Sequence, residues 1–166
     1  MSFLNTQIPL TNQPNRAADK LQADPLLGFN FALKLEGDLA GFFTEASGVG
    51  SEHEVVDHKV VNDKGQEIIR KIPGRMKWSD VTLKRGITQD LEIWRWRQTV
   101  VEGKMSQARK NCTIEMFDRT YGEPVAIWHF YNAWPSKVSG PSLKSDSNEY
   151  GIEEITFVHE GMYREK

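Results

Sequence analysis

The chain has 166 residues and a mass of 19.0 kDa, a length typical of one domain. Lys and Arg number 21 and Asp and Glu number 23, so the net charge of −2 argues against non-specific nucleic-acid binding through a broad basic surface. A single cysteine, Cys112, excludes an internal disulfide framework and a cysteine-based zinc cluster. Apolar residues make up 39% of the chain, which predicts a folded core. Their runs are short and interrupted by charge, so we expect no membrane insertion, and the amino terminus lacks the pattern of a signal peptide.

The first 24 residues differ in composition from the rest. They are rich in Asn and Gln, and they contain Pro9 and Pro14, which fix the backbone and remove hydrogen-bond donors. We therefore expect an arm over residues 1–24 that is flexible alone and could be ordered by a partner, and a β domain over residues 25–166.

Period-two alternation opens the β domain. Between Phe29 and Glu36 every second residue is a large apolar one, which predicts a strand with one buried face. Gly37 and Asp38 indicate a turn, and residues 39–46 are predicted to form the returning strand. A glycine-containing break follows at residues 47–50.

Residues 51–77 predict a long, charged hairpin. Valines favour strand on the way out, residues 62–65 are typical of a tight turn, and isoleucines resume on the way back to Pro73 and Gly74. The charge is polarised along the chain. Acidic residues lie on the outgoing strand and basic ones on the return: Glu52, Glu54 and Asp57, then Arg70, Lys71, Arg75 and Lys77.

One amphipathic helix is predicted after a short strand at residues 81–83. Thr88 is the expected cap, acidic residues occupy the first turn, and Gly103 is the expected stop. Ile93, Trp96 and Val100 form one stripe, which we expect to pack on the core, with Trp94 at its edge.

The remaining pattern predicts strands at residues 112–117, 125–131 and 152–159. We expect Trp134 and Pro135 to end the middle strand and residues 136–149 to form a loop. About seven strands and one helix indicate a mainly β fold. Its two packed antiparallel sheets would form a sandwich or barrel, flanked by the helix and the charged hairpin.

Residue patterns for chemistry are absent from the sequence. It has no P-loop, no GxSxG elbow and no HExxH helix. His53 and His58 are predicted on opposite faces of a strand, as are Glu153 and Glu154, so neither pair predicts a metal or acid–base site. Cys112 is predicted to be a buried structural thiol. We therefore expect no enzyme activity, cofactor or metal.

Several short stretches, taken together in order, resemble the tail tube proteins of contractile phages and phage-tail-like contractile injection systems. The resemblance covers residues 24–164. It is carried by FFTEASG at 42–48, Pro73-Gly74, TLKRGIT at 82–88, NAWP at 132–135 and HEG at 159–161. The sequence departs from the family pattern in a longer amino-terminal arm and in Asp57-His58-Lys59, where a Tyr-containing, glycine-rich run is expected.

The resemblance implies a structural inner-tube protein. Hexameric rings would stack into a hollow tube inside a contractile sheath, be driven through a target envelope, and conduct DNA or effector proteins. The implied partners are copies of the chain itself, the sheath protein, baseplate or tube-initiator proteins and a cap or terminator. Assembly is expected in the bacterial cytoplasm, within a particle that can be released from the cell.

The resemblance also implies contact roles. The hairpin charges listed above become candidates for contacts between rings, and Trp94, Arg95 and Arg97 become candidates for contacts between subunits. Two alternatives stay open. The chain could form the tube-initiator ring of a baseplate, or it could be a monomeric β-barrel that binds a small ligand in its core.

Overall fold

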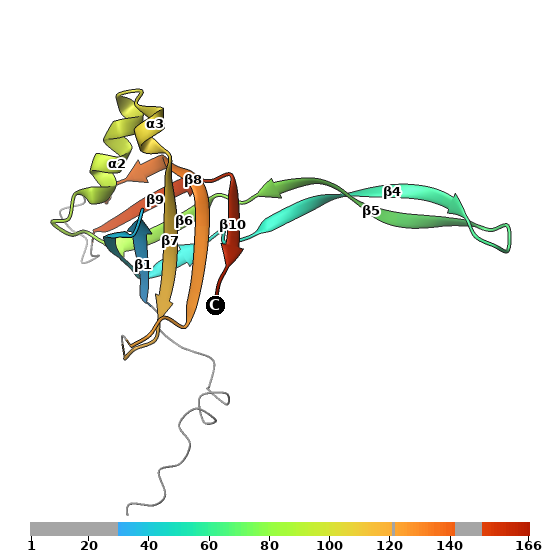
Figure 1. Ribbon diagram of the computed structural model, residues 1–166, viewed down its shortest axis with the longest axis horizontal. Helices are drawn as coiled ribbons and strands as arrows, with labels where there is room; N and C mark the ends of the chain where they lie inside the picture. The colour runs from blue at the N-terminus through green and yellow to red at the C-terminus, as the bar shows by residue number, and fades with distance from the viewer. Residues whose placement is uncertain (1–29, 121, 142–150) are drawn as a thin grey trace, which may run out of the picture.

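The computed structural model describes residues 30–120, 122–141 and 151–166, and its core lies between two antiparallel sheets (Figure 1). The predicted arm at residues 1–24 and residues 142–150 of the predicted loop lie outside these ranges. The first sheet contains β2 (Asp38–Phe43), β1 (Asn30–Leu35), β7 (Lys110–Phe117), β8 (Ala126–Ser139) and β10 (Gly161–Arg164). The second contains the end of β8 with β9 (Ile152–Val158), β6 (Val81–Gly86) and β3 (Glu45–Ser47). The predicted fold class of two packed antiparallel sheets is confirmed.

Strand β8 belongs to both sheets, which corrects the predicted end at Trp134 and Pro135. Its first half pairs with β7 and β10, and its second half pairs with β9. The backbone takes a positive φ of 49° at Asn132, where the partners change. Pro135 stays in the strand opposite Phe157, and the register shifts directly after it. A bulge at that point accommodates a residue without an N–H group, so the proline does not end the strand.

The predicted returning strand at residues 39–46 is two strands. β2 pairs with β1, and after Thr44 the chain crosses to the second sheet, where β3 pairs with β6. The last predicted strand likewise continues, after a turn at His159 and Glu160, into β10. The described residues therefore contain ten strands rather than about seven. The extra strands are short and arise where the chain changes sheet or turns back, which alternation alone does not reveal.

Helix α2 (Glu92–Val101) begins four residues later than the predicted cap at Thr88. Thr88 instead accepts a hydrogen bond from the Asp90 backbone, and the Asp90 carboxylate accepts one from the Glu92 N–H group. The predicted stop is confirmed, since Gly103 has a φ of 75° and donates to the carbonyl of Val100. A four-residue helix, α3 (Met105–Ala108), follows. Neither helix in the described part of the chain is long and apolar enough to cross a membrane.

The core is filled by side chains from both sheets and from α2. Ile93 and Trp96 are buried on the sheets, as predicted, while Val100 is half-buried. Cys112 is buried, also as predicted, and burial raises the pKa of its thiol far above the ordinary range. The largest fully buried side chains are Phe43, Phe130, Phe157, Leu33, Leu83, Ile114, Ile155 and Val81.

A buried arginine joins β6, β9 and the start of α2. Arg85 is 3% exposed, and its Nε donates to Glu153 at 3.0 Å. Its other nitrogens donate to the carboxylate and carbonyl oxygens of Asp90, and Trp94 donates to the second oxygen of Glu153 at 3.0 Å. Gly41 makes room for this guanidinium, because a Cβ there would lie 2.4 Å from it. A buried charge is tolerated when it is paired in this way.

We expect Trp96→Ala to lower the free energy of unfolding by about 3–5 kcal/mol, the usual cost of removing a buried tryptophan. The side chain is 3% exposed and its Nε1 donates to the Ala108 carbonyl at 2.7 Å, so the mutation also removes a buried hydrogen bond. Denaturant unfolding of dilute protein, followed by far-UV circular dichroism, measures the loss. Val101→Ala, on the exposed side of the same helix, is the control and should change stability by about 0.5 kcal/mol or less. Equal effects of the two mutations would show that the buried and exposed sides of the helix are wrongly assigned.

Candidate functional site: a projecting hairpin

Strands β4 (Ser51–Val61) and β5 (Glu67–Trp78) form a two-stranded hairpin that extends far from the two-sheet body (Figure 1). The predicted turn is confirmed at its tip. The Asn62 side-chain oxygen accepts hydrogen bonds from the Lys64 and Gln66 backbone, and Gly65 has a φ of 75°. Nearly every hairpin residue is exposed, so the arm has no tertiary packing of its own within the chain.

The base of the hairpin is held firmly against the body. Gly48 has a φ of 78°, and a Cβ there would lie 1.9 Å from the Asp80 carbonyl oxygen, so only glycine allows this close approach. The ring nitrogens of His159 lie 3.1 Å from the carbonyl oxygens of Ser79 and Gly161. The same ring packs beside Trp78, with ring centroids 5.6 Å apart. These contacts fix the direction in which the arm leaves the body.

One face of the hairpin, the charged face, carries ion pairs between its two strands, together with the exposed side chains of Val55, Val61 and Ile69. Lys71 lies opposite Asp57 and is 2.5 Å from its carboxylate, and Lys59 is 2.9 Å from Glu67. Acidic and basic residues therefore do lie on separate strands, as predicted, but the register of the hairpin places opposite charges next to each other within one chain. Because these pairs are exposed, each contributes only about 0–1 kcal/mol.

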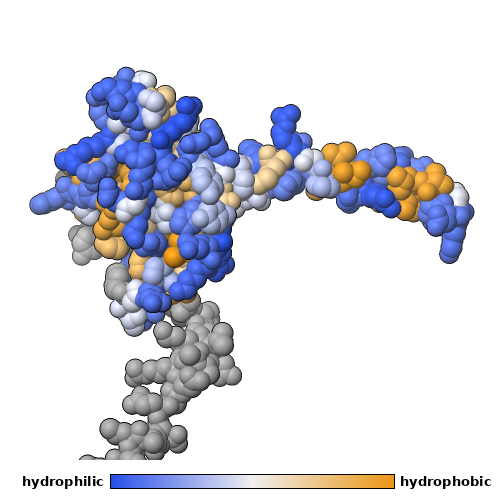
Figure 2. Space-filling view, in the orientation of Figure 1, coloured by the Kyte–Doolittle hydropathy of each residue, from blue (hydrophilic) through white to orange (hydrophobic). Residues whose placement is uncertain are grey.

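The opposite face, the apolar face, combines two apolar cross-strand pairs around one cation. Val56 lies opposite Ile72 and Val60 opposite Ile68, and Arg70 lies opposite His58 between them. Residues two apart in a strand share a face, so these six side chains point the same way. This face was not predicted from the sequence, although the period-two spacing of residues 56, 58 and 60 and of residues 68, 70 and 72 indicates it. Figure 2 shows apolar side chains among the hydrophilic ones along the outer part of the arm.

Four of the predicted inter-ring residues gather at the base of the hairpin. A bulge after His53 interrupts the register there, and an open hollow of about 590 Å³ lies beside it. Its lining mixes both signs of charge with one thioether: Glu52, His53, Glu54, Arg75, Met76 and Lys77. The other three predicted residues, Asp57, Arg70 and Lys71, lie further out, and Arg70 is on the opposite face from the other two.

The predicted inter-subunit residues on α2 do not form one surface. Trp94 is half-buried and bonds to Glu153, so it also supports its own subunit. Arg97 is three residues further along and shares its side of the helix, and it is exposed. Arg95 points elsewhere and pairs with Glu92.

No arrangement in the described residues resembles a working catalytic site. Thr113, His129 and Glu165 are hydrogen-bonded in series at 3.0 and 2.6 Å, in the manner of a nucleophile, base and acid. However, Thr113 lies in a strand paired on both sides, so the surrounding backbone N–H groups are used in the sheet and cannot form an oxyanion hole. Among the described residues, no three His, Cys, Asp or Glu side chains gather as metal ligands. Glu153 points into the core and Glu154 outward, as predicted.

Comparison with solved structures places the fold. A chain of the sheath–tube complex of the extracellular contractile injection system PVC, in the extended state, matches with a TM-score of 0.70 and 19% identity, covering 93% of this chain and 99% of that one. A chain of the PVC sheath/tube terminator gives a TM-score of 0.66 at 20% identity, covering 87% and 97%. A chain of the anti-feeding prophage baseplate gives 0.63 at 16% identity, covering 86% and 96%.

Comparison of the sequence places the family. No relative was found among curated proteins. The family model described as the T4-like virus tail tube protein gp19 matches residues 27–163, which is most of the chain. This match confirms the resemblance carried by the short stretches between residues 42 and 161. The chain therefore belongs to the T4-like virus tail tube protein family, and it is a structural tube component of a contractile, phage-tail-like system.

Proposed function

We propose that copies of this chain form hexameric rings that stack into the hollow tube of a contractile particle. The proposal rests on two features of the chain: the unpaired edges of its sheets and the hairpin that extends far from its body. Within the described residues, β2, β3 and β10 each pair with a single neighbouring strand. Exposed edges promote pairing with other chains, and a ring in which each edge meets a neighbour's edge removes that hazard.

The tube would lie inside a sheath, with a baseplate or initiator at one end and a cap or terminator at the other. The solved chains similar in fold come from a sheath–tube complex, a terminator and a baseplate, which supports these partners as the ones to test. Assembly would take place in the bacterial cytoplasm, and the lumen would carry DNA or an effector protein. A ligand-binding barrel is disfavoured because large side chains such as Phe43, Phe130 and Phe157 fill the core.

The purified protein should form hollow, sixfold rings, with a mass in solution six times the 19.0 kDa of the chain, and these rings should stack into tubes. Multi-angle light scattering across a concentration series and negative-stain electron microscopy make the measurement. Long tubes indicate the main tube protein, whereas isolated rings that fail to stack indicate an initiator ring. A strict monomer at high concentration, with no rings on the grid, would contradict the proposal.

The hairpin should mediate stacking of rings rather than closure of each ring. Reversing Arg70 and Lys71 to Glu should leave single rings intact but shorten the tubes, because one small loss repeats at six positions in every junction. Tube length and ring count by electron microscopy distinguish the two effects. Lys104→Glu is the control, since it reverses a paired lysine that is 55% exposed, against 67% for Lys71, and lies far from the arm. If the double reversal abolishes rings instead, the arm belongs to the contact within the ring.

Helix α2 should contribute to the contact between subunits through the side that carries Trp94 and Arg97. Arg97 is exposed and makes no ion pair or hydrogen bond in the described residues, so Arg97→Glu should weaken ring formation without lowering the melting temperature. Arg95→Glu places the same change on another side of the same helix and serves as the control. Ring assembly by light scattering should fall for the first variant and not for the second. The reverse order would place the contact on the side of Arg95.

A further inference from the structure

An exposed groove lies beside β2, and the other described residues leave it uncovered. Leu39 and Phe42 are 49% and 51% exposed and line the groove, whose volume is about 250 Å³. Gly41, Arg85, Thr88 and Asp90 complete the lining, which we call the β2 groove. Ile87 and Leu91, on the connection that forms its other wall, are also exposed.

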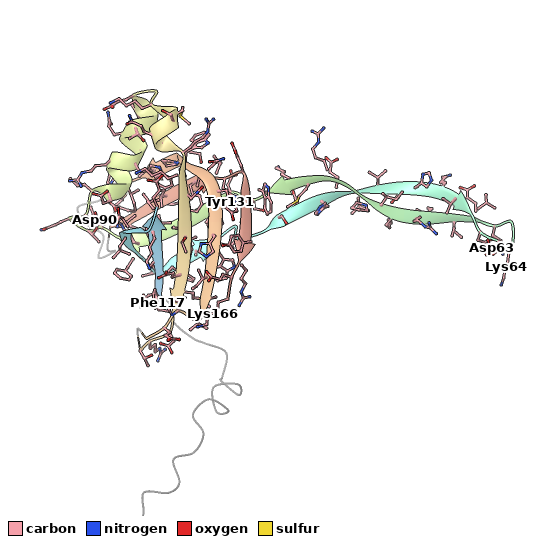
Figure 3. The ribbon with its side chains drawn as sticks, in the orientation of Figure 1. Asp63, Lys64, Asp90, Phe117, Tyr131 and Lys166 are labelled. Atoms are coloured by element: carbon pink, nitrogen blue, oxygen red, sulfur yellow. The ribbon has the colours of Figure 1, made fainter. Side chains whose placement is uncertain are left out.

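The β2 groove and the hairpin tip lie at opposite ends of the molecule. Figure 3 labels Asp90 at one end and Asp63 and Lys64 at the other. A contact between the arm of one copy and the groove of the next is therefore heterologous, and it leaves a free arm and a free groove at the ends of every chain of copies. Such a contact continues from copy to copy, as a tube requires.

The two surfaces are complementary in both apolar character and charge. The apolar face of the hairpin carries Arg70 at its centre, and this guanidinium makes no ion pair or hydrogen bond in the described residues. Asp38 directly precedes Leu39 in β2, outside the groove lining, and its exposed carboxylate has no partner in the described part of the chain either. Asp90 supplies a 39%-exposed carboxylate to the lining itself, where Arg85 contacts it at 3.4 Å. The free cation within the apolar stripe is thus matched by a free carboxylate, that of Asp38, one residue from the apolar groove.

We infer that the apolar face of the hairpin, defined by Val56, Val60, Ile68 and Ile72 around Arg70, docks in the β2 groove of a second copy of this chain. The inference rests on the proposed assembly, and it adds the receiving surface and the face of the arm that meets it. Arg70 pairs there with Asp38, while the ion pairs of the charged face stay on the solvent side.

Cross-linking between introduced cysteines tests the docking face directly. The only native cysteine, Cys112, is buried with a raised pKa, so the unmodified protein should not react and new thiols report alone. A chain carrying Phe42→Cys and Ile68→Cys, treated with a short bis-maleimide, should give a ladder of linked copies on a denaturing gel. Phe42→Cys with Ile69→Cys is the matched control. Because neighbouring residues of a strand point to opposite faces, this variant should lose the ladder.

The outcomes separate the docking site from the assembly itself. A ladder from the variant with Ile68→Cys that is absent from the variant with Ile69→Cys supports the inference. Equal ladders, or a ladder with position 69 alone, overturn it. No ladder in a sample that shows tubes by microscopy also overturns it and leaves the tube proposal standing, whereas no ladder and no rings contradict both. If Phe42→Cys fails to fold, Leu39→Cys places the thiol on the same groove.

Charge exchange gives an independent measurement. Arg70→Asp should shorten the tubes, Asp38→Arg should do the same, and the double variant should restore their length, because the pair is re-formed with its signs exchanged. Failure of the double variant to recover length, with all three variants folded by circular dichroism, overturns the pairing of Arg70 with Asp38.

Discussion

A two-stranded hairpin cannot bury its own apolar side chains, and this constraint governs the rest of the structure. Isolated hairpins are at most marginally stable in water. This one nevertheless leaves Val56, Ile68 and Ile72 of its apolar face 38–50% exposed, and Val55, Val61 and Ile69 of its charged face 58–70% exposed. Fully burying one such side chain contributes about 1.5–3 kcal/mol, against about 0–1 for an exposed ion pair. Contacts of the apolar face with another copy can therefore supply more free energy than the charges that dominate the sequence of the arm.

The body contains the features needed to hold such an arm in place. Gly48 permits the backbone to pass against Asp80, and His159 ties the base of the arm to the turn between β9 and β10. At the opposite end, Arg85 connects β6 and β9 to the start of α2 and shapes the β2 groove. Strand β8 runs through both sheets, so the two ends are joined by one continuous strand and by the core packed on it.

Sequence patterns predicted those parts of the fold that depend on local periodicity. Alternation over residues 29–36 located β1, the stripe of Ile93 and Trp96 phased α2, and the Asn62–Gly65 turn closed the hairpin. The parts that escaped prediction depend on tertiary context. Pro135 is accommodated by a bulge that only the pairing with β9 reveals. Nothing in the sequence around Arg85 indicates that Glu153, sixty-eight residues away, neutralises its charge in the core.

The hairpin shows the same difference between what local sequence patterns predict and what depends on tertiary structure. Polarised charge was visible in the sequence, but its meaning depended on register, which sets Lys71 against Asp57 and leaves Arg70 unpaired on the other face. An unpaired cation between two apolar pairs contributes little to the stability of a single chain. It gains a role when a second chain offers a carboxylate close to an apolar groove, as Asp38 does one residue before Leu39. Apolar contact then supplies the affinity, and the charge pair selects one register of the arm over its neighbours, because a slip by one residue would turn Arg70 away and present Lys71 and Ile69 instead.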